Sequence, residues 1–173
     1  MTCLIVVSSK SGNTRLVADA LASELAGAGV AAAGPFAPEE VAEAELGGAD
    51  TVLAGFWTDK GDCAPDLAAV LERLGGKRVF LFGTAGFGGS EAYFAQILDR
   101  VRVHLPEDAT YLGGAMCQGK MGAGVRARYE AMLAEHPGDD RIRGMIDNFD
   151  AALAHPDEAD LARIVAAARE ALA

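Results

Sequence analysis

The residues best suited to chemistry stand in one short turn near the start of the chain. Residues 9–14 read Ser-Lys-Ser-Gly-Asn-Thr, follow an apolar run and open a stretch of helical periodicity. The first N–H groups of a helix have no partner within it, and together with hydroxyl groups they favour a bound anion. A glycine there lets the backbone approach a phosphate closely. The turn therefore predicts a phosphate site, although the same residue types also cap helices without binding a ligand.

Two common nucleotide-binding motifs do not fit this turn. A Walker A motif needs Gly-x-x-x-x-Gly-Lys-Ser/Thr and a dinucleotide fingerprint needs Gly-x-Gly-x-x-Gly, and residues 8–14 contain neither. A response regulator would have acidic residues at the end of the preceding strand, where Ser8 and Ser9 stand. Residues 122–127 loosely fit Gly-x-Gly-x-x-Ala, but without the rest of a nucleotide-binding unit chance explains the match better.

Short β-branched runs alternate with longer Ala- and Leu-rich segments that would position this turn. The runs lack polar alternation, which indicates strands buried on both faces of a parallel sheet. Five strands are predicted, the last of them central: 4–8, 30–34, 50–56, 78–83 and 110–116. Helices are predicted at 13–28, within 35–48, at 65–74, at 90–103 and from about 125 to 135. In such a doubly wound α/β fold, ligands bind at the carboxyl ends of the strands.

The remainder of the chain departs from this repeat. Residues 140–155 and 157–172 are each predicted to form a helix, and His155-Pro156 separates the two. The sequence contains no flexible linker or low-complexity stretch. We therefore expect one domain over residues 1–173, with a core of about 1–135 and a C-terminal helical extension of about 138–173.

Composition and charge exclude several classes of function. The chain has 15 Lys and Arg against 25 Asp and Glu, a net charge of −10, and only 6% aromatic residues, which disfavours nucleic-acid binding. No apolar run approaches the roughly 18 residues that span a membrane, and the N-terminus does not resemble a secretory signal. Cys3, Cys63 and Cys117 are odd in number and far apart, as in a cytoplasmic protein with reduced thiols. We expect Cys63 and Cys117 to be inert thiols rather than a redox pair. The histidines are scattered along the sequence, so we expect neither a metal site nor a catalytic imidazole.

The first turn resembles the phosphate-binding loop of the flavodoxins, Thr/Ser-x-Thr/Ser-Gly-x-Thr, in both residue types and position. The matching residues are Ser9, Lys10, Ser11, Gly12, Asn13 and Thr14. The resemblance covers about residues 1–135 and implies a flavodoxin-like, doubly wound, five-stranded parallel sheet with extra C-terminal helices. It also implies FMN as the cofactor, with its 5′-phosphate held in this loop by hydroxyl and amide groups.

Two later loops strengthen the resemblance, because flavodoxins place such loops on either side of the isoalloxazine ring. The cofactor-binding roles that it implies fall on Phe56, Trp57, Thr58, Gly61, Thr84, Ala85, Gly86 and Phe87. Trp57 is the only tryptophan and the natural stacking residue, unless it is a core-edge side chain. Phe87 either contacts the ring or covers the end of the sheet.

The resemblance predicts an electron-transfer protein that delivers electrons through FMN to a partner reductase. No acid, base or nucleophile is evident in the loops, which fits a protein whose chemistry belongs to its cofactor. Residues 55–61, 82–90 and 116–121 also resemble a subfamily of flavodoxin-like proteins of anaerobes, some of them associated with bilirubin reductase, which implies that enzyme as a partner. The protein is expected to be a monomer or weak dimer that binds neither nucleic acid nor membranes.

Two other functions remain open. An NAD(P)H- or quinone-linked FMN oxidoreductase would hold a substrate above the ring, in a pocket built by the loop after Lys120 and the extra helices. A flavin-free binding module would use the same turn for another phosphate. Lys120 could stabilise an anionic reduced flavin or a substrate carboxylate, although a solvated turn lysine is the simpler interpretation. Asp59, Asp62 and Asp66 would give the flavin edge an acidic rim suited to docking.

Overall fold

The computed structural model describes residues 2–173, which contain a five-stranded parallel sheet. Its strands are β1 (Thr2–Val7), β2 (Ala31–Phe36), β3 (Thr51–Trp57), β4 (Arg78–Ala85) and β5 (Thr110–Gln118). They lie in the order β2-β1-β3-β4-β5, so the strand order reverses between β1 and β3. Such a switch point opens a crevice at the carboxyl ends of the strands. The predicted doubly wound α/β fold is confirmed.

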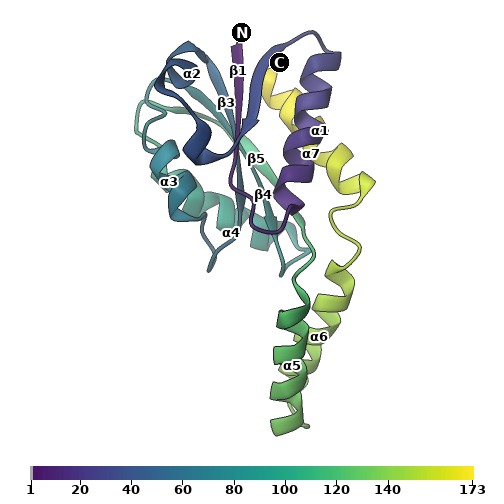
Figure 1. Ribbon diagram of the computed structural model, residues 1–173. Helices are drawn as coiled ribbons and strands as arrows, with labels where there is room; N and C mark the ends of the chain where they lie inside the picture. Colours follow the sequence, from purple (N-terminus) through teal and green to yellow (C-terminus); the bar gives the residue numbers. More distant parts are fainter. Residues whose placement is uncertain (1) are drawn as a thin grey trace.

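Helices cover both faces of the sheet. The helices of the described residues are α1 (Asn13–Gly27), α2 (Glu43–Gly48), α3 (Pro65–Leu71), α4 (Glu91–Val101), α5 (Ala123–Glu135), α6 (Asp140–Ala152) and α7 (Glu158–Leu172), with short 3₁₀ turns at Pro38–Glu40 and Arg102–His104; all but α5 and α6 lie on the faces of the sheet. Successive strand residues point to opposite faces. Ile5 and Leu53 therefore pack with α1 and α7, whereas Leu4 and Val52 pack on the side of α2, α3 and α4. Figure 1 shows α1 and α7 on one face of the sheet and α2, α3 and α4 on the other.

Strand β5 lies at an edge of the sheet, so the prediction of a central fifth strand is wrong. Its only neighbour in the sheet is β4. Helix α7 packs along β5 and joins Leu112 and Ala115 to the core shared with α1. Burial under a helix, rather than between two strands, explains the apolar composition that suggested a central position.

Two predicted boundaries shift for local reasons. Strand β4 extends to Ala85 because β5 pairs with it to the end, with Thr84 opposite Cys117 and Ala85 opposite Gln118. The predicted acidic helix within residues 35–48 is divided into a 3₁₀ turn and α2. The side chain of Glu45 accepts a hydrogen bond from the Ala42 amide (2.9 Å), which caps α2 and favours a new helix start there.

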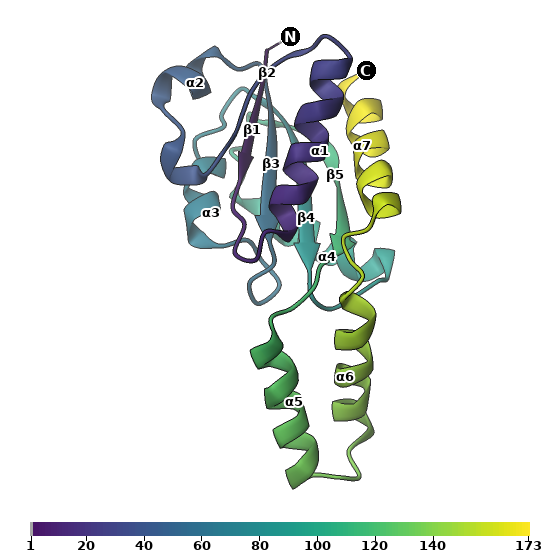
Figure 2. The same ribbon diagram turned by 45° about the vertical axis from the view of Figure 1, so that its right-hand side comes forward.

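Helices α5 and α6 pair as a hairpin that projects from the carboxyl end of the sheet (Figure 2). Helix α7 then returns and packs against β5 and α1. Helix α7 was expected in the C-terminal extension but packs on the sheet. Helix α5 was expected in the core but belongs to the projecting hairpin. In α5 only Tyr129 is buried, whereas α7 buries Ile164 and Ala168. No helix in residues 2–173 is long and apolar enough to cross a membrane.

Candidate functional site

The turn between β1 and α1 has the geometry of an anion site. Gly12 has a φ of +85°, a left-handed conformation that favours glycine, and α1 begins at the next residue. Among residues 2–173, no acceptor is bonded to the backbone N–H groups of residues 10–14, whereas the Arg15 amide donates to Ser9 Oγ (3.2 Å). Unpaired amides and the positive end of the helix dipole favour a bound phosphate here.

Asn13 joins this turn to the loop after β5. Its Nδ2 atom donates to Ser11 Oγ (3.0 Å) and to the Lys120 carbonyl (2.8 Å). A Cβ atom at Gly119 would lie 2.6 Å from Asn13 Nδ2, so only glycine fits beside it. Asn13 Oδ1 is buried and has no hydrogen-bond partner in the described part of the chain. A buried acceptor left unpaired costs about 1–3 kcal/mol, and a ligand hydroxyl would remove that penalty.

Hydrogen bonds tie the loops that follow β1, β3, β4 and β5 to one another. The hydroxyl of buried Thr14 lies 2.9 Å from that of Thr84. The Thr84 carbonyl accepts from the amide (2.9 Å) and the hydroxyl (3.0 Å) of Thr58. The Gly119 amide donates to the Ala85 carbonyl (3.0 Å). The carboxyl edge of the sheet is therefore one connected frame rather than four independent loops.

A cavity of about 910 Å³ opens between these loops, which is a typical size for a cofactor site. The predicted site residues that line it are Lys10, Ser11, Asn13, Trp57, Thr58, Gly61, Thr84, Ala85, Gly86 and Phe87. Ser9 and Gly12 line an adjoining cavity of about 470 Å³ that shares Lys10 and Trp57 with the larger one. The structure thus brings the first turn and both ring-flanking loops together.

Phe56 and Thr14 line neither of these cavities. Phe56 is fully buried, and a Cβ atom at Gly83 would lie 2.6 Å from its ring. Because side chains alternate along a strand, Phe56 faces the core whereas Trp57, the next residue, faces the cavity. The buried Thr14 hydroxyl instead forms a hydrogen bond with the Thr84 hydroxyl.

The cavity also contains side chains that no local motif marks. Tyr93 comes from α4, Met121 from the loop after β5, and Val125, Arg128 and Tyr129 from α5. The rings of Tyr129 and Phe87 meet edge to face, with centroids 6.4 Å apart. These residues reach the site because the α5–α6 hairpin starts beside it, which is a tertiary feature that spacing in the sequence does not reveal.

The charged groups of the larger cavity are mostly cationic. Lys10, Lys60, Lys120 and Arg128 line it together with a single carboxylate, Asp59, which is the only one of the three aspartates considered for an acidic rim that lines this cavity. Asp62 is instead engaged by His104 Nε2 (3.1 Å), and Asp66 accepts from Ser8 Oγ (2.8 Å) beside the smaller cavity. The ammonium group of Lys10 lies 4.7 Å from the centroid of the Trp57 ring, a cation–π contact.

All three cysteines are buried free thiols. Burial, with smaller contributions from neighbouring carboxylates such as Asp62 and Asp160, raises the pKa of both Cys63 and Cys117 to about 12. Burial also raises the pKa of Cys3. The thiolate is the reactive form of cysteine, so these side chains are poor nucleophiles near neutral pH.

Two groups of side chains bring potential metal ligands within 4.8 Å of one another: Asp62, Cys63 and His104, and His155, Asp157 and Asp160. Local spacing could not reveal the first group, because Asp62 and His104 are 42 residues apart. In the second group His155 Nδ1 lies 2.5 Å from Asp160 Oδ2, and Asp157 Oδ1 accepts from the Asp160 amide (2.8 Å) at the start of α7. Hydrogen bonds account for the proximity of most of these side chains.

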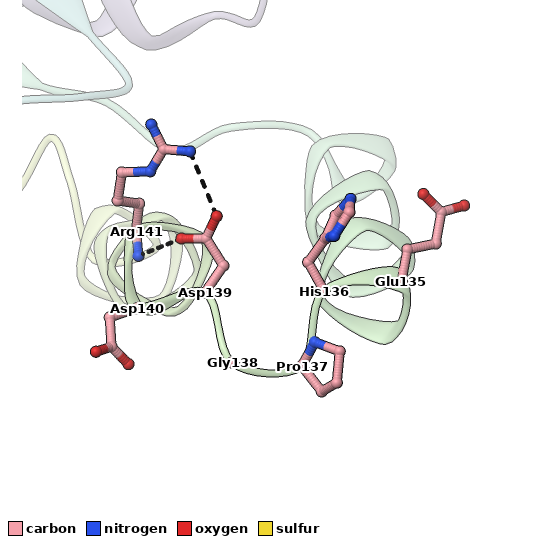
Figure 3. A pocket seen from close by; sticks show the side chains of 7 residues that line it. All are labelled: Glu135, His136, Pro137, Gly138, Asp139, Asp140 and Arg141. Carbon is pink, nitrogen blue, oxygen red and sulfur yellow. Dashed lines mark hydrogen bonds and ion pairs between the residues drawn. The ribbon is translucent and has the colours of Figure 1, made fainter.

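A separate hollow of about 630 Å³ lies at the far end of the α5–α6 hairpin (Figure 3). Residues 135–141 line it, and Arg141 hydrogen-bonds to Asp139 through its side chain (3.4 Å) and its backbone amide (2.9 Å). These two bonds hold the pKa of Asp139 below its ordinary value. The hollow shares no residue with the cavities at the sheet edge.

The sheet order and the phosphate-type turn beside a cavity define a flavodoxin-like, FMN-binding redox protein. The sequence profile of the flavodoxin domain matches residues 4–169, and the chain belongs to that family. The prediction of FMN as the cofactor is thereby confirmed. The match also extends through most of α7, the helix that covers β5.

Two clostridial relatives and a solved structure are similar to this chain. Flavodoxin-like domain-containing protein BilS of Clostridium symbiosum (strain WAL-14163) is 40% identical over 176 residues, which covers 94% of this chain and 91% of the relative. BilS of Clostridioides difficile (strain CD3) is 37% identical over 112 residues, 65% of this chain and 64% of the relative. The flavodoxin of Streptococcus pneumonia TIGR4 has a TM-score of 0.54 at 19% identity, covering 87% of this chain and 99% of that structure, which shows the fold alone.

The residues present at the sheet edge fit FMN. The unpaired amides of residues 10–14 and the Ser11 hydroxyl suit its phosphate, and the orphaned Asn13 Oδ1 suits a hydroxyl donor. Trp57 and Phe87 line the same cavity from two different loops and would offer aromatic surface to the ring. Bound FMN supplies reversible electron transfer, and the chain supplies binding, orientation and shielding from water.

Proposed function

We propose that the protein is an FMN-dependent electron carrier that serves a partner reductase. The composition of the larger cavity carries this proposal. The described residues that line it include no histidine, cysteine or glutamate, and Asp59 is the single carboxylate. The lysine and tyrosine side chains that line it make no side-chain hydrogen bond to another described residue, so none is held by a partner that would activate it as an acid or base. A carrier needs binding and orienting groups only, because the electron chemistry belongs to the flavin.

The resemblance to flavodoxin-like proteins associated with bilirubin reductase, and the similarity to two BilS proteins, support bilirubin reductase as the candidate partner. In the proposed site the phosphate lies against residues 9–14. The ring lies between the loop that contains Trp57 and the loop that contains Phe87, with its edge toward the mouth of the cavity.

Electron transfer with and without a hydride donor tests this function. FMN-loaded protein that has been reduced by light under anaerobic conditions, with EDTA as the sacrificial electron donor, is expected to reduce added cytochrome c. The same protein should not oxidise NADH or NADPH at a steady rate in the absence of a second protein. Steady oxidation of either nucleotide would contradict the carrier and favour the alternative, an FMN oxidoreductase whose substrate lies beside Tyr129 and Arg128 in the cavity.

A further inference from the structure

The positive charge of this acidic protein is concentrated beside the flavin site. The chain carries a net charge of −10 and has four lysines, Lys10, Lys60, Lys77 and Lys120. All of these except Lys77 line the larger cavity, together with Arg128. The local charge therefore has the opposite sign to that of the molecule as a whole.

The cations at this cavity lack acidic partners. Within residues 2–173, none of Lys10, Lys60, Lys120 and Arg128 forms a salt bridge. Eight arginines elsewhere are paired with carboxylates: Arg15, Arg73, Arg102, Arg126, Arg141, Arg143, Arg163 and Arg169. Most cations away from the cavity thus have a carboxylate partner, whereas the cations at the cavity have none and remain available to another molecule.

Three of these cations stand on separate parts of the frame. Lys60 occupies a tight turn closed by reciprocal backbone hydrogen bonds between Asp59 and Asp62 (2.8 and 3.0 Å). The backbone of Lys120 donates to the His155 carbonyl (2.9 Å) and accepts from Asn13, which fixes the point from which its side chain extends. Arg128 projects from α5. All three side chains are exposed, so they lie where a docking surface meets the cavity.

We infer that Lys60, Lys120 and Arg128, the cationic rim, dock an acidic protein surface that surrounds the redox centre of the electron-transfer partner. This inference rests on the proposed carrier function. Lys10 is left out of the rim because it belongs to the phosphate turn and covers Trp57. Charge complementarity at a docking surface speeds encounter and orients the partners.

A protein surface suits the cationic rim better than a small anion does. A site for one carboxylate or phosphate would bring several donors onto one buried point, commonly with a bidentate arginine. The rim instead spreads exposed charges without carboxylate partners over a loop after β3, a loop after β5 and a helix, and the Arg128 guanidinium lies over the Tyr129 ring (5.6 Å to the centroid). Exposed charges of this kind mainly control the association rate and its dependence on salt.

Quenching of the sole tryptophan measures the local charge without any redox step. Trp57 lines the cavity, and its emission in the FMN-free full-length chain can be quenched with iodide or with caesium. We expect the ratio of the iodide to the caesium quenching constant to be about threefold larger for Trp57 than for free N-acetyltryptophanamide, against the sign of the net charge. The triple variant Lys60→Asn, Lys120→Gln, Arg128→Gln should lower this ratio without removing the part due to Lys10, which lies over the Trp57 ring; asparagine is chosen at position 60 because Lys60 has a φ of +52°. A ratio in the unaltered protein at or below that of N-acetyltryptophanamide, or a ratio that the triple variant leaves unchanged, would overturn the inference.

The docking claim is tested with two protein acceptors of opposite charge. Light-reduced, FMN-loaded protein is mixed with acidic cytochrome b5 or basic cytochrome c at several salt concentrations. We expect the rate constant for cytochrome b5 to fall about tenfold between low and high salt, and that for cytochrome c to change less or to rise. The rim triple variant should lose this fall. A matched variant, Arg141→Gln, Arg143→Gln, Arg169→Gln, has the same net charge as the rim triple variant. Its rate constants should nevertheless show the salt dependence of the unaltered protein, because these arginines lie far along the hairpin or on α7.

Failure of the inference can be distinguished from failure of the proposed function. If the protein reduces both cytochromes but the rate constants follow the net charge of −10, the carrier stands and the cationic rim does not dock acidic partners. A salt-sensitive rate with ferricyanide alone, and not with cytochrome b5, would indicate a site for a small anion and would overturn the docking surface. Transfer to neither cytochrome from a fully reduced flavin would overturn the carrier function itself.

Discussion

Replacement of Ser9 and Ser11 with alanine is expected to weaken FMN binding by about 150-fold or more, because two hydroxyl donors to a charged phosphate contribute about 1.5–3 kcal/mol each. Both side chains belong to the turn whose amides are unpaired, and neither is part of the apolar core. Riboflavin has the same ring and ribityl chain without the phosphate. Its dissociation constant should change less than about threefold, as measured by flavin fluorescence or calorimetry.

The ratio of the two dissociation constants decides this prediction. Thr110→Ala removes an exposed hydroxyl at the opposite end of the sheet and should alter neither constant. Equal weakening of FMN and riboflavin by the double variant would mean that the loop shapes the site without contacting phosphate. Unchanged FMN affinity would remove residues 9–14 from the cofactor site.

Two neighbouring aromatic residues of β3 are expected to have opposite effects. Phe56→Ala should lower the free energy of unfolding by about 3–5 kcal/mol, because it empties a fully buried space beside Gly83. Trp57→Ala should change that free energy much less but raise the dissociation constant of FMN about 10- to 100-fold, because it removes aromatic surface from the cavity. Denaturant unfolding and flavin titration of the same samples give both quantities.

Milder variants keep this comparison interpretable. Phe56→Leu preserves an apolar side chain and should leave enough folded protein to show unaltered FMN affinity. Trp57→Phe retains an aromatic face and should recover most of the binding lost in Trp57→Ala. A large loss of FMN affinity in Phe56→Leu, or an unchanged affinity in Trp57→Ala, would contradict the placement of these side chains on opposite faces of β3.

Local patterns in the sequence were sufficient to predict the parallel sheet, whereas the phosphate-binding role of the turn at residues 9–14 stays a prediction. A β-branched run followed by a hydroxyl- and glycine-rich turn is a short-range signal, and the carboxyl ends of parallel strands meet at one edge of a sheet. This is why loops as distant in sequence as those of Ser11, Trp57 and Phe87 could be expected to meet, and they line one cavity. Phe56 belongs by sequence to the same segment as Trp57, but β3 continues through both residues, so the alternation of side chains turns Phe56 toward the core.

Features that depend on tertiary packing could not be predicted in this way. Helical periodicity identifies α5, α6 and α7 but does not show which of them covers β5. An amphipathic helix can bury its apolar face against any apolar surface, so its sequence does not specify the partner. The hairpin of α5 and α6 then carries Arg128 and Tyr129 to the cavity, far from any motif. Net charge is equally uninformative about position: a value of −10 is compatible with a cationic site when the acidic residues lie elsewhere.

Titration of Trp57 emission with FMN tests the central claim, that the cofactor lies between the loops at the carboxyl edge of the sheet. Trp57 is the only tryptophan, and it lines the cavity together with Ser11 and Gly86, so its fluorescence reports on this site alone. We predict strong quenching that saturates at one FMN per chain, and a shift of the titration to higher concentration in the Ser9→Ala, Ser11→Ala variant. FMN that binds stoichiometrically while leaving the emission of Trp57 unchanged would contradict the assignment of this cavity as the flavin site.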